Sequence, residues 1–208
     1  MTSHAEYTEL PRGSQTSLNL GGVQEPSISL NLLPAVAVGG PPHSGKSVLT
    51  YSLTKALRGR GVDHYVIRAY PPDGEGDWFL DGEPSTVRHV RVKGARSEAW
   101  LPLLRRDVAA RHLPLLVDMG GLPTTEQETV LDACTHALLL TPSPRDTAAH
   151  DAWQARTARH GLVTIADLRS DLHGKNALET TEPVIRGTLA GLERWREAEG
   201  PAFAALVE

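Results

Sequence analysis

The feature that most constrains this 208-residue chain is a glycine-rich stretch at residues 40–47, GPPHSGKS. It matches the Walker A pattern G-x-x-x-x-G-K-[ST] without a gap. An unbroken apolar run at residues 35–38 precedes it, which is typical of a strand buried on both faces in a parallel sheet. Apolar residues at helical spacing follow from Val48 to Leu57. The stretch therefore occupies the strand-to-helix turn that a phosphate-binding loop requires.

Each fixed position of the pattern has a chemical reason. Gly40 and Gly45 let the backbone bend so that successive N–H groups point toward a phosphate. Lys46 brings a positive charge to the β- and γ-phosphates, and Ser47 offers a hydroxyl to Mg²⁺. The amino end of the following helix adds a partial positive charge. The predicted nucleotide-binding residues are Gly40, Pro41, Pro42, His43, Ser44, Gly45, Lys46, Ser47, Val48 and Gly121.

Apolar runs and helical patterns alternate along the rest of the chain. We expect strands at residues 64–69, 113–118, 137–141 and 162–168, and helices at residues 97–111, 146–160 and 184–197. This order predicts an α/β protein with a three-layer P-loop NTPase fold, in which helices flank a mainly parallel sheet of about five strands. The predicted nucleotide-binding domain spans residues 34–208. Residues 1–33 show no sustained periodicity, and we expect a tail or linker there.

A phosphate loop needs a carboxylate that orients magnesium, and Asp118 ends the apolar run at residues 113–118. We predict that Ser47 and Asp118 bind Mg²⁺, and that Lys46 and Asp118 are catalytic; a loop cap is the alternative role for Asp118. Gly120 and Gly121 follow directly, so one of their N–H groups could contact the γ-phosphate, or they could form only a tight turn. ATP is expected rather than GTP, because residues 141–146 (TPSPRD) lack a guanine-reading Asn-Lys-x-Asp segment.

Two charged segments between the second and third predicted strands are further candidates. Residues 73–78 (DGEGDW) hold three carboxylates, of which one could act as a base or bind a second magnesium; a solvated turn is the alternative. The basic cluster at residues 88–96 could bind an anionic second ligand such as an oligonucleotide, or it could be a charged edge strand. The catalytic candidates of the first segment are Asp73, Glu75 and Asp77. The basic side chains of the second are Arg88, His89, Arg91, Lys93 and Arg96.

Composition limits the protein class. A formal net charge of -4 gives no general attraction for nucleic acid. Cys134 is the one cysteine, which excludes an internal disulfide, and we expect a packed thiol rather than a nucleophile. The amino terminus does not read as a secretory signal, and no apolar run approaches the length of a membrane span. We therefore expect a cytoplasmic protein without membrane contact.

Four segments together resemble a specific family: residues 37–47 (AVGGPPHSGKS), 73–78 (DGEGDW), 117–121 (VDMGG) and 134–136 (CTH). They are similar to the P-loop ATPase-like domain joined to CRISPR-associated ring nucleases of type III systems, over about residues 34–194. In that family a nuclease domain that handles cyclic oligoadenylates precedes the ATPase-like domain. The 33 residues before Pro34 are too few for such a fold. The resemblance implies a role in antiviral defence, with the nuclease lost or supplied by another chain.

Two functions stay open from the sequence. The first is an enzyme, an ATPase or small-molecule kinase that hydrolyses ATP or transfers its phosphoryl group with Mg²⁺. The second is a nucleotide-dependent regulatory module for a partner that handles cyclic oligoadenylates, with little or no turnover. Candidate partners are the nucleoside triphosphate, a ring nuclease or other CRISPR defence protein, an oligonucleotide and a second copy of this chain.

Overall fold

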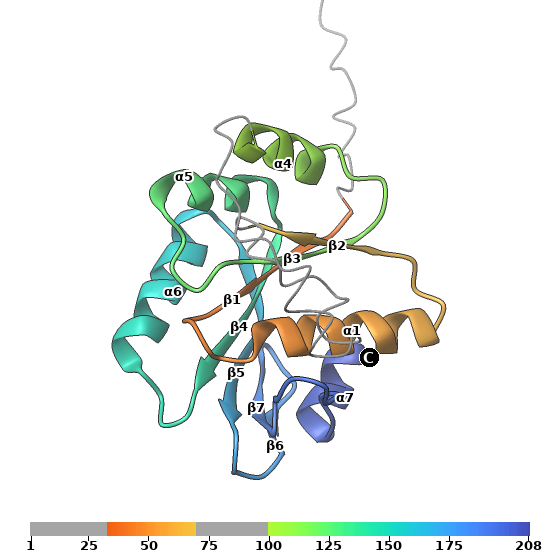
Figure 1. The fold of residues 1–208 in the computed structure, drawn as a ribbon, viewed down its shortest axis with the longest axis vertical. Coiled ribbons are helices and arrows are strands. Elements are labelled where there is room, and N and C mark those ends of the chain that lie inside the picture. Colours follow the sequence, from red (N-terminus) through yellow and green to blue (C-terminus); the bar gives the residue numbers. More distant parts are fainter. Residues whose placement is uncertain (1–32, 70–99) are drawn as a thin grey trace, which may run out of the picture. The chain divides into compact units, whose positions relative to one another are not determined.

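The computed structural model describes residues 33–69 and 100–208, and within these ranges the chain forms one seven-stranded sheet (Figure 1). The strand order is β2-β3-β1-β4-β5-β7-β6. The strands are β1 Ala35–Gly39, β2 Tyr65–Arg68, β3 Leu115–Asp118, β4 His136–Pro142, β5 Val163–Asp171, β6 Ala177–Thr180 and β7 Ile185–Ala190. The pairs are parallel except for β6 with β7, which are antiparallel.

Helices cover both faces of this sheet (Figure 1). They are α1 Lys46–Gly59, α4 Trp100–Ala109, α5 Thr125–Glu128, the 3₁₀ turn η1 Thr129–Ala133, α6 Thr147–Arg159 and α7 Pro201–Val207. Buried side chains of α4, η1 and α6 pack on one face, and those of α1 and α7 pack on the other. The described residues therefore confirm the predicted three-layer α/β fold with a mainly parallel sheet.

The central strand β1 shows why the sequence places apolar residues on consecutive positions. Ala37 packs with the α6 side of the sheet, whereas Val38 packs with the α1 side. A strand flanked by parallel neighbours and covered on both faces has no solvent-facing side. Its sequence therefore does not alternate between apolar and polar residues. At its end, Gly39 lies against Trp153, because a Cβ built on this glycine would be 2.6 Å from the indole ring.

The carboxyl-terminal third differs from the prediction. The prediction of a helix at residues 184–197 is wrong, because residues 185–190 form strand β7 and the next helix begins only at Pro201. The apolar residues Ile185, Leu189 and Leu192 have helical spacing, but backbone pairing with β5 decides the conformation. Gly187 fits this strand, because a Cβ there would be 2.3 Å from the carbonyl oxygen of Ala177 on β6. The sheet thus has two strands, β6 and β7, that periodicity did not predict.

Other expectations concern segments that the structure does not describe. The predicted tail lies outside the described residues except for Leu33, and so do residues 70–99, which include the predicted edge strand at 87–92. In the described ranges, no helix combines the length and apolar character needed to cross a bilayer.

Candidate functional site

The loop between β1 and α1 has the bent backbone that the Walker A pattern predicts. Gly40 has φ 145°, and a Cβ on it would be 2.0 Å from the carbonyl oxygen of Leu140 on β4. Gly45 has φ 87° and forms the N-cap of α1; its added Cβ would be 2.9 Å from Leu192. The positive φ angles and the lack of room for a Cβ atom together require glycine at both positions. The loop is therefore confined at each end by a distant segment of the chain.

Lys46 is held above this loop by the loop's own acceptors. Its Nζ donates to the carbonyl oxygens of Gly40 at 2.9 Å and Pro41 at 2.7 Å, and it lies 3.3 Å from the Ser44 hydroxyl. The residue is 8% exposed. Burial lowers the pKa of Lys46 from 10.5 to about 8, although the charge of Asp118 acts in the opposite direction. The ammonium group is therefore fixed in position before a ligand arrives.

Ser47 and Asp118 come together at the ends of neighbouring segments. Strands β1 and β3 pair with Val38 opposite Asp118, so the carboxylate lies beside the start of the loop. Ser47 donates a hydrogen bond from Oγ to Asp118 Oδ2 at 3.1 Å, and Asp118 is 1% exposed. A hydroxyl and a carboxylate are the hard oxygen donors that Mg²⁺ prefers. The two predicted metal ligands are thus adjacent, and their chemistry fits the ion.

The turn after Asp118 lies directly against the loop at residues 40–47. A Cβ built on Gly121 would be 2.4 Å from the backbone nitrogen of Pro42. The two backbones therefore touch at a point where a side chain on residue 121 has no room. The role of Gly121 as a γ-phosphate contact remains a prediction. Such a contact requires that Gly121 lie beside the loop at residues 40–47, and it does.

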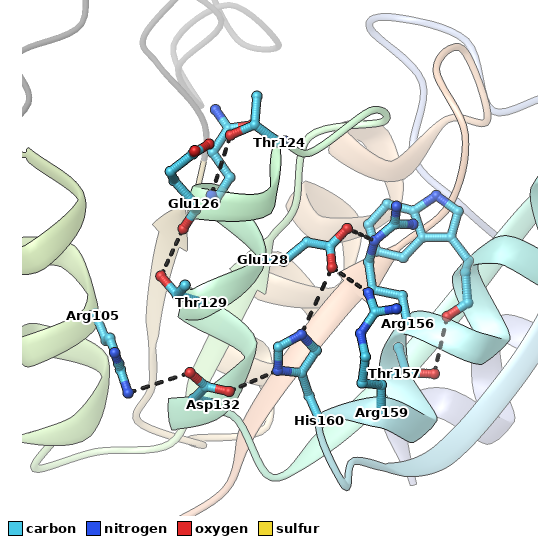
Figure 2. Close-up of polar contacts among 12 residues, drawn as sticks. Arg105, Thr124, Glu126, Glu128, Thr129, Asp132, Arg156, Thr157, Arg159 and His160 are labelled. Atoms are coloured by element: carbon cyan, nitrogen blue, oxygen red, sulfur yellow. Dashed lines mark hydrogen bonds and ion pairs between the residues drawn. The ribbon is translucent and has the colours of Figure 1, made fainter.

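After this turn, a group of ion pairs holds α5 and η1 to the carboxyl-terminal end of α6 (Figure 2). Glu128 accepts hydrogen bonds from Arg156 at 2.7 Å and from Arg159. Asp132 accepts from His160 at 2.7 Å and pairs with Arg105 of α4 at 3.3 Å. The start of α5 has its own capping box, in which Thr124 and Gln127 exchange hydrogen bonds. Residues 119–123 therefore connect two well-held elements, β3 and α5.

Several sequence candidates are placed elsewhere or are not described. Asp73, Glu75 and Asp77 lie outside the described residues, as do the basic side chains at residues 88–96. His43 is exposed on the loop with φ 62°. Arg145 follows the fourth predicted strand, where the sequence allows a contact with a base or phosphate or a plain surface position. In the structure it lies on the loop between β4 and α6, where it pairs with Asp167 and contacts His150. Cys134 is buried, and burial raises the pKa of its thiol to about 12, which confirms the packed thiol.

The residues that sequence reasoning missed are those that confine the loop. Leu192 packs with Val48 and Tyr51 of α1 as well as against Gly45. It was assigned to a helix, and no local pattern connects it with residue 45. The carbonyl oxygen of Leu140 acts through its backbone and leaves no residue signature. Only the strand order brings these two positions to the loop.

Comparisons with known proteins give the following. No protein-family model matches the chain, and no curated protein matches it. Among solved structures, the signal recognition particle receptor FtsY from Elizabethkingia anophelis, in complex with GDP, is 11% identical with a TM-score of 0.44 over 91% of this chain. Chloroplast FtsY from Physcomitrella patens is 17% identical with a TM-score of 0.36 over 76%. The chain spans 65% and 53% of these two proteins. The fold assignment rests on the sheet and the loop described above.

Proposed function

We propose that residues 34–208 bind a magnesium nucleoside triphosphate, ATP in the first instance, in the loop at residues 40–47 and cleave or transfer its terminal phosphoryl group. The observation that carries the proposal is the placement of Lys46 and Ser47 at one preformed loop, with Asp118 beside them at the end of strand β3. A charged donor and a hydroxyl at the start of a helix, with a buried carboxylate beside them, form a set that fits a polyphosphate and its cation.

Each side chain has a distinct task in this proposal. Lys46 neutralises phosphate charge, and its attachment to two carbonyl oxygens avoids the entropy loss of ordering a free lysine on binding. Ser47 and Asp118 would hold the magnesium ion, which supplies charge neutralisation on the phosphate oxygens. Gly121 keeps the neighbouring turn close to the loop. The helix α1 directs its amino end toward the same place.

The choice of ATP rests on the absence of an Asn-Lys-x-Asp segment at residues 141–146. The proposed setting in CRISPR-linked antiviral defence, with a partner that handles cyclic oligoadenylates, rests on the resemblance of the four segments quoted above. The regulatory module with little turnover is the second candidate function.

The test combines binding and turnover on the purified chain. Titration of ATP and GTP with and without Mg²⁺ gives the affinities, and phosphate release with and without candidate acceptors or cyclic oligoadenylate gives the rates. We expect Mg²⁺-dependent ATP binding that Lys46→Ala weakens by about tenfold or more, because the phosphate contact is lost. Lys55→Ala is the matched control, since Lys55 lies on the same helix and pairs with Glu197 on the surface.

The outcomes separate the alternatives. Binding with phosphate release supports the enzyme, and tight binding without release supports the regulatory module. Wild-type affinity in folded Lys46→Ala, judged by circular dichroism, would contradict the assignment of the phosphate loop. Tighter binding of GTP than ATP would overturn the choice of base.

A further inference from the structure

Gly191 combines a left-handed backbone with open space beside it. Its φ is 63°, and in the described part of the chain a Cβ built on it would meet no atom within 4 Å beyond its two neighbours in sequence. Two other described glycines share both properties, Gly61 with φ 74° and Gly161 with φ 70°. What distinguishes Gly191 from these two is its place in the fold.

Gly61 and Gly161 each end a helix. They follow the last turns of α1 and α6, and in both cases the backbone N–H of the next residue donates back into that turn at 3.0 Å. A left-handed glycine is a common way to end a helix, so the fold alone explains these two positions. Gly191 follows strand β7 instead. Its conformation and the space beside it therefore need another explanation.

Gly191 lies at the carboxyl end of the sheet, close to the loop at residues 40–47. Its N–H donates to the carbonyl oxygen of Asp171, the last residue of β5, at 3.0 Å. The next residue, Leu192, touches Gly45 and packs on Val48 of α1. Ligands of open α/β sheets bind at this edge, outside the carboxyl ends of the strands. The space beside Gly191 is therefore one residue away from a contact with the proposed phosphate site.

The strand order gives a direction to a nucleotide bound in the loop. Asp118 ends β3, on one side of β1, and under the proposed function it holds the ion and the terminal phosphates there together with Ser47. Strands β4, β5 and β7 lie on the other side of β1. A nucleotide whose terminal phosphates lie on the β3 side directs its nucleoside toward the ends of β5 and β7, where Gly191 leaves room.

The residues around Gly191 suit the flat face of a nucleobase. Asp171 pairs with Ala190, so Leu172 and Gly191 are the next residues on the two neighbouring strands, and Leu172 is 50% exposed. Apolar side chains beside a bare backbone offer surface to a planar ring, whereas a side chain at residue 191 would stand in its way. We infer that the nucleoside of the bound nucleotide lies over Gly191, in contact with Leu172 and Leu192. This subsite rests on the proposed function and adds residues that the phosphate chemistry does not use.

The test compares ATP with inorganic tripolyphosphate, which has the phosphates but no nucleoside, each titrated with Mg²⁺ into the full chain. Gly191→Asn fills the open space, because asparagine tolerates a left-handed backbone but carries a side chain. We expect this variant to bind ATP about tenfold more weakly, and tripolyphosphate within about twofold of wild type. Gly61→Asn and Gly161→Asn are the matched controls, since they change the same kind of glycine before β2 and β5, and they should leave both affinities unchanged.

A second variant, Leu172→Ala, shortens an exposed side chain without touching the backbone, so it tests the subsite even if Gly191→Asn does not fold. It should weaken ATP binding about threefold and leave tripolyphosphate binding unchanged. Leu103→Ala is its control, at a 48% exposed position on α4, and should change neither affinity. Wild-type affinity for ATP in either folded variant, or equal losses for ATP and tripolyphosphate, would overturn the subsite alone. Failure of the wild-type chain to bind either probe, or binding that Lys46→Ala does not weaken, would overturn the proposed function and the subsite with it.

Discussion

Ser47 Oγ donates a hydrogen bond to Asp118 Oδ2 at 3.1 Å, which joins the first turn of α1 to the end of β3. The first prediction follows from this pair. Ser47→Ala and Asp118→Asn should each weaken Mg²⁺-dependent nucleotide binding by about tenfold, and the double variant should be little worse, because both changes remove one ion site. Titrations with Mg²⁺ and with EDTA measure the effect. An equal loss for Asp118→Asn in both conditions would assign Asp118 a structural role.

The second prediction concerns pH. Burial lowers the pKa of Lys46 to about 8, and a bound phosphate favours the ammonium form, so binding above pH 8 requires proton uptake. We expect the Kd for ADP without Mg²⁺ to rise about tenfold per pH unit above pH 8 and to change little between pH 7 and 8. Calorimetry in buffers of different ionisation enthalpy measures the proton directly. The same slope in Lys46→Gln would exclude Lys46 as its source.

The lowered pKa of Lys46 also has a consequence for stability. Between about pH 8 and 10.5 the unfolded chain holds a proton on Lys46 that the folded chain has lost. The contribution of this residue to the free energy of unfolding therefore rises with pH across that window. Comparing the pH dependence of unfolding for wild type and Lys46→Met should reveal this rise as a difference between them. Parallel curves across the window would contradict the lowered pKa.

The third prediction concerns the contact between Gly121 and the phosphate loop. Gly121→Ala places a Cβ 2.4 Å from the backbone of Pro42, so one of the two segments must move. We expect nucleotide affinity to fall by about tenfold with the fold retained. Gly59→Ala is the control, because a Cβ at the end of α1 meets nothing within 4 Å. Titration of both variants measures the nucleotide affinity, and circular dichroism checks that the fold is retained. Wild-type affinity in Gly121→Ala would show that nucleotide binding does not need this contact.

The fourth prediction concerns Glu128. Burial alone would raise the pKa of Glu128. The hydrogen bonds and positive charges of Arg156 and Arg159 together outweigh this effect, so the pKa lies below its ordinary value. Glu128→Gln should reduce the free energy of unfolding at pH 7 by about 2 kcal/mol. The difference should vanish as acid protonates Glu128 in the folded protein, because the stabilising charge is then lost in wild type as well.

Urea denaturation at pH 7 and over a series of decreasing pH values measures the Glu128 contribution. Glu179→Gln serves as the matched control, since its ion pair with Arg169 is largely exposed and should contribute at most about 0.5 kcal/mol. A loss for Glu128→Gln no larger than for Glu179→Gln would contradict the role of the ion pairs in holding α5 and η1 to α6.

The sequence predicted the elements whose signal is local. The loop at residues 40–47 and its flanking β1 and α1 could be placed because glycine, lysine and apolar residues occur at fixed spacing. Asp118 was found because a carboxylate ends a buried run, and the structure brings it to Ser47. The helix at residues 146–160 is observed as α6, with Asp146 as its N-cap.

The sequence failed where pairing between distant segments decides the structure. Residues 185–190 have helical spacing but pair with β5, and the contact between Leu192 and Gly45 depends on that strand. The bulge in β5, where Ala137 of β4 pairs with Thr164 and Leu138 pairs with Ala166, likewise appears only in the register of the two strands. These features arise from long-range packing, which overrides local propensity.

The confinement of the loop at residues 40–47 by Leu140 and Leu192 has a consequence during protein synthesis. The ribosome completes the motif at Ser47 before it makes the two segments that confine the glycines of the motif and the strands β3 and β4 that flank β1. A nascent chain that ends before Leu192 therefore carries every residue of the motif without the packing that shapes it. Under the proposed function, nucleotide can join the chain only after Leu192 has been made, so it acts on a domain whose sheet strands are all present and not on an early folding intermediate.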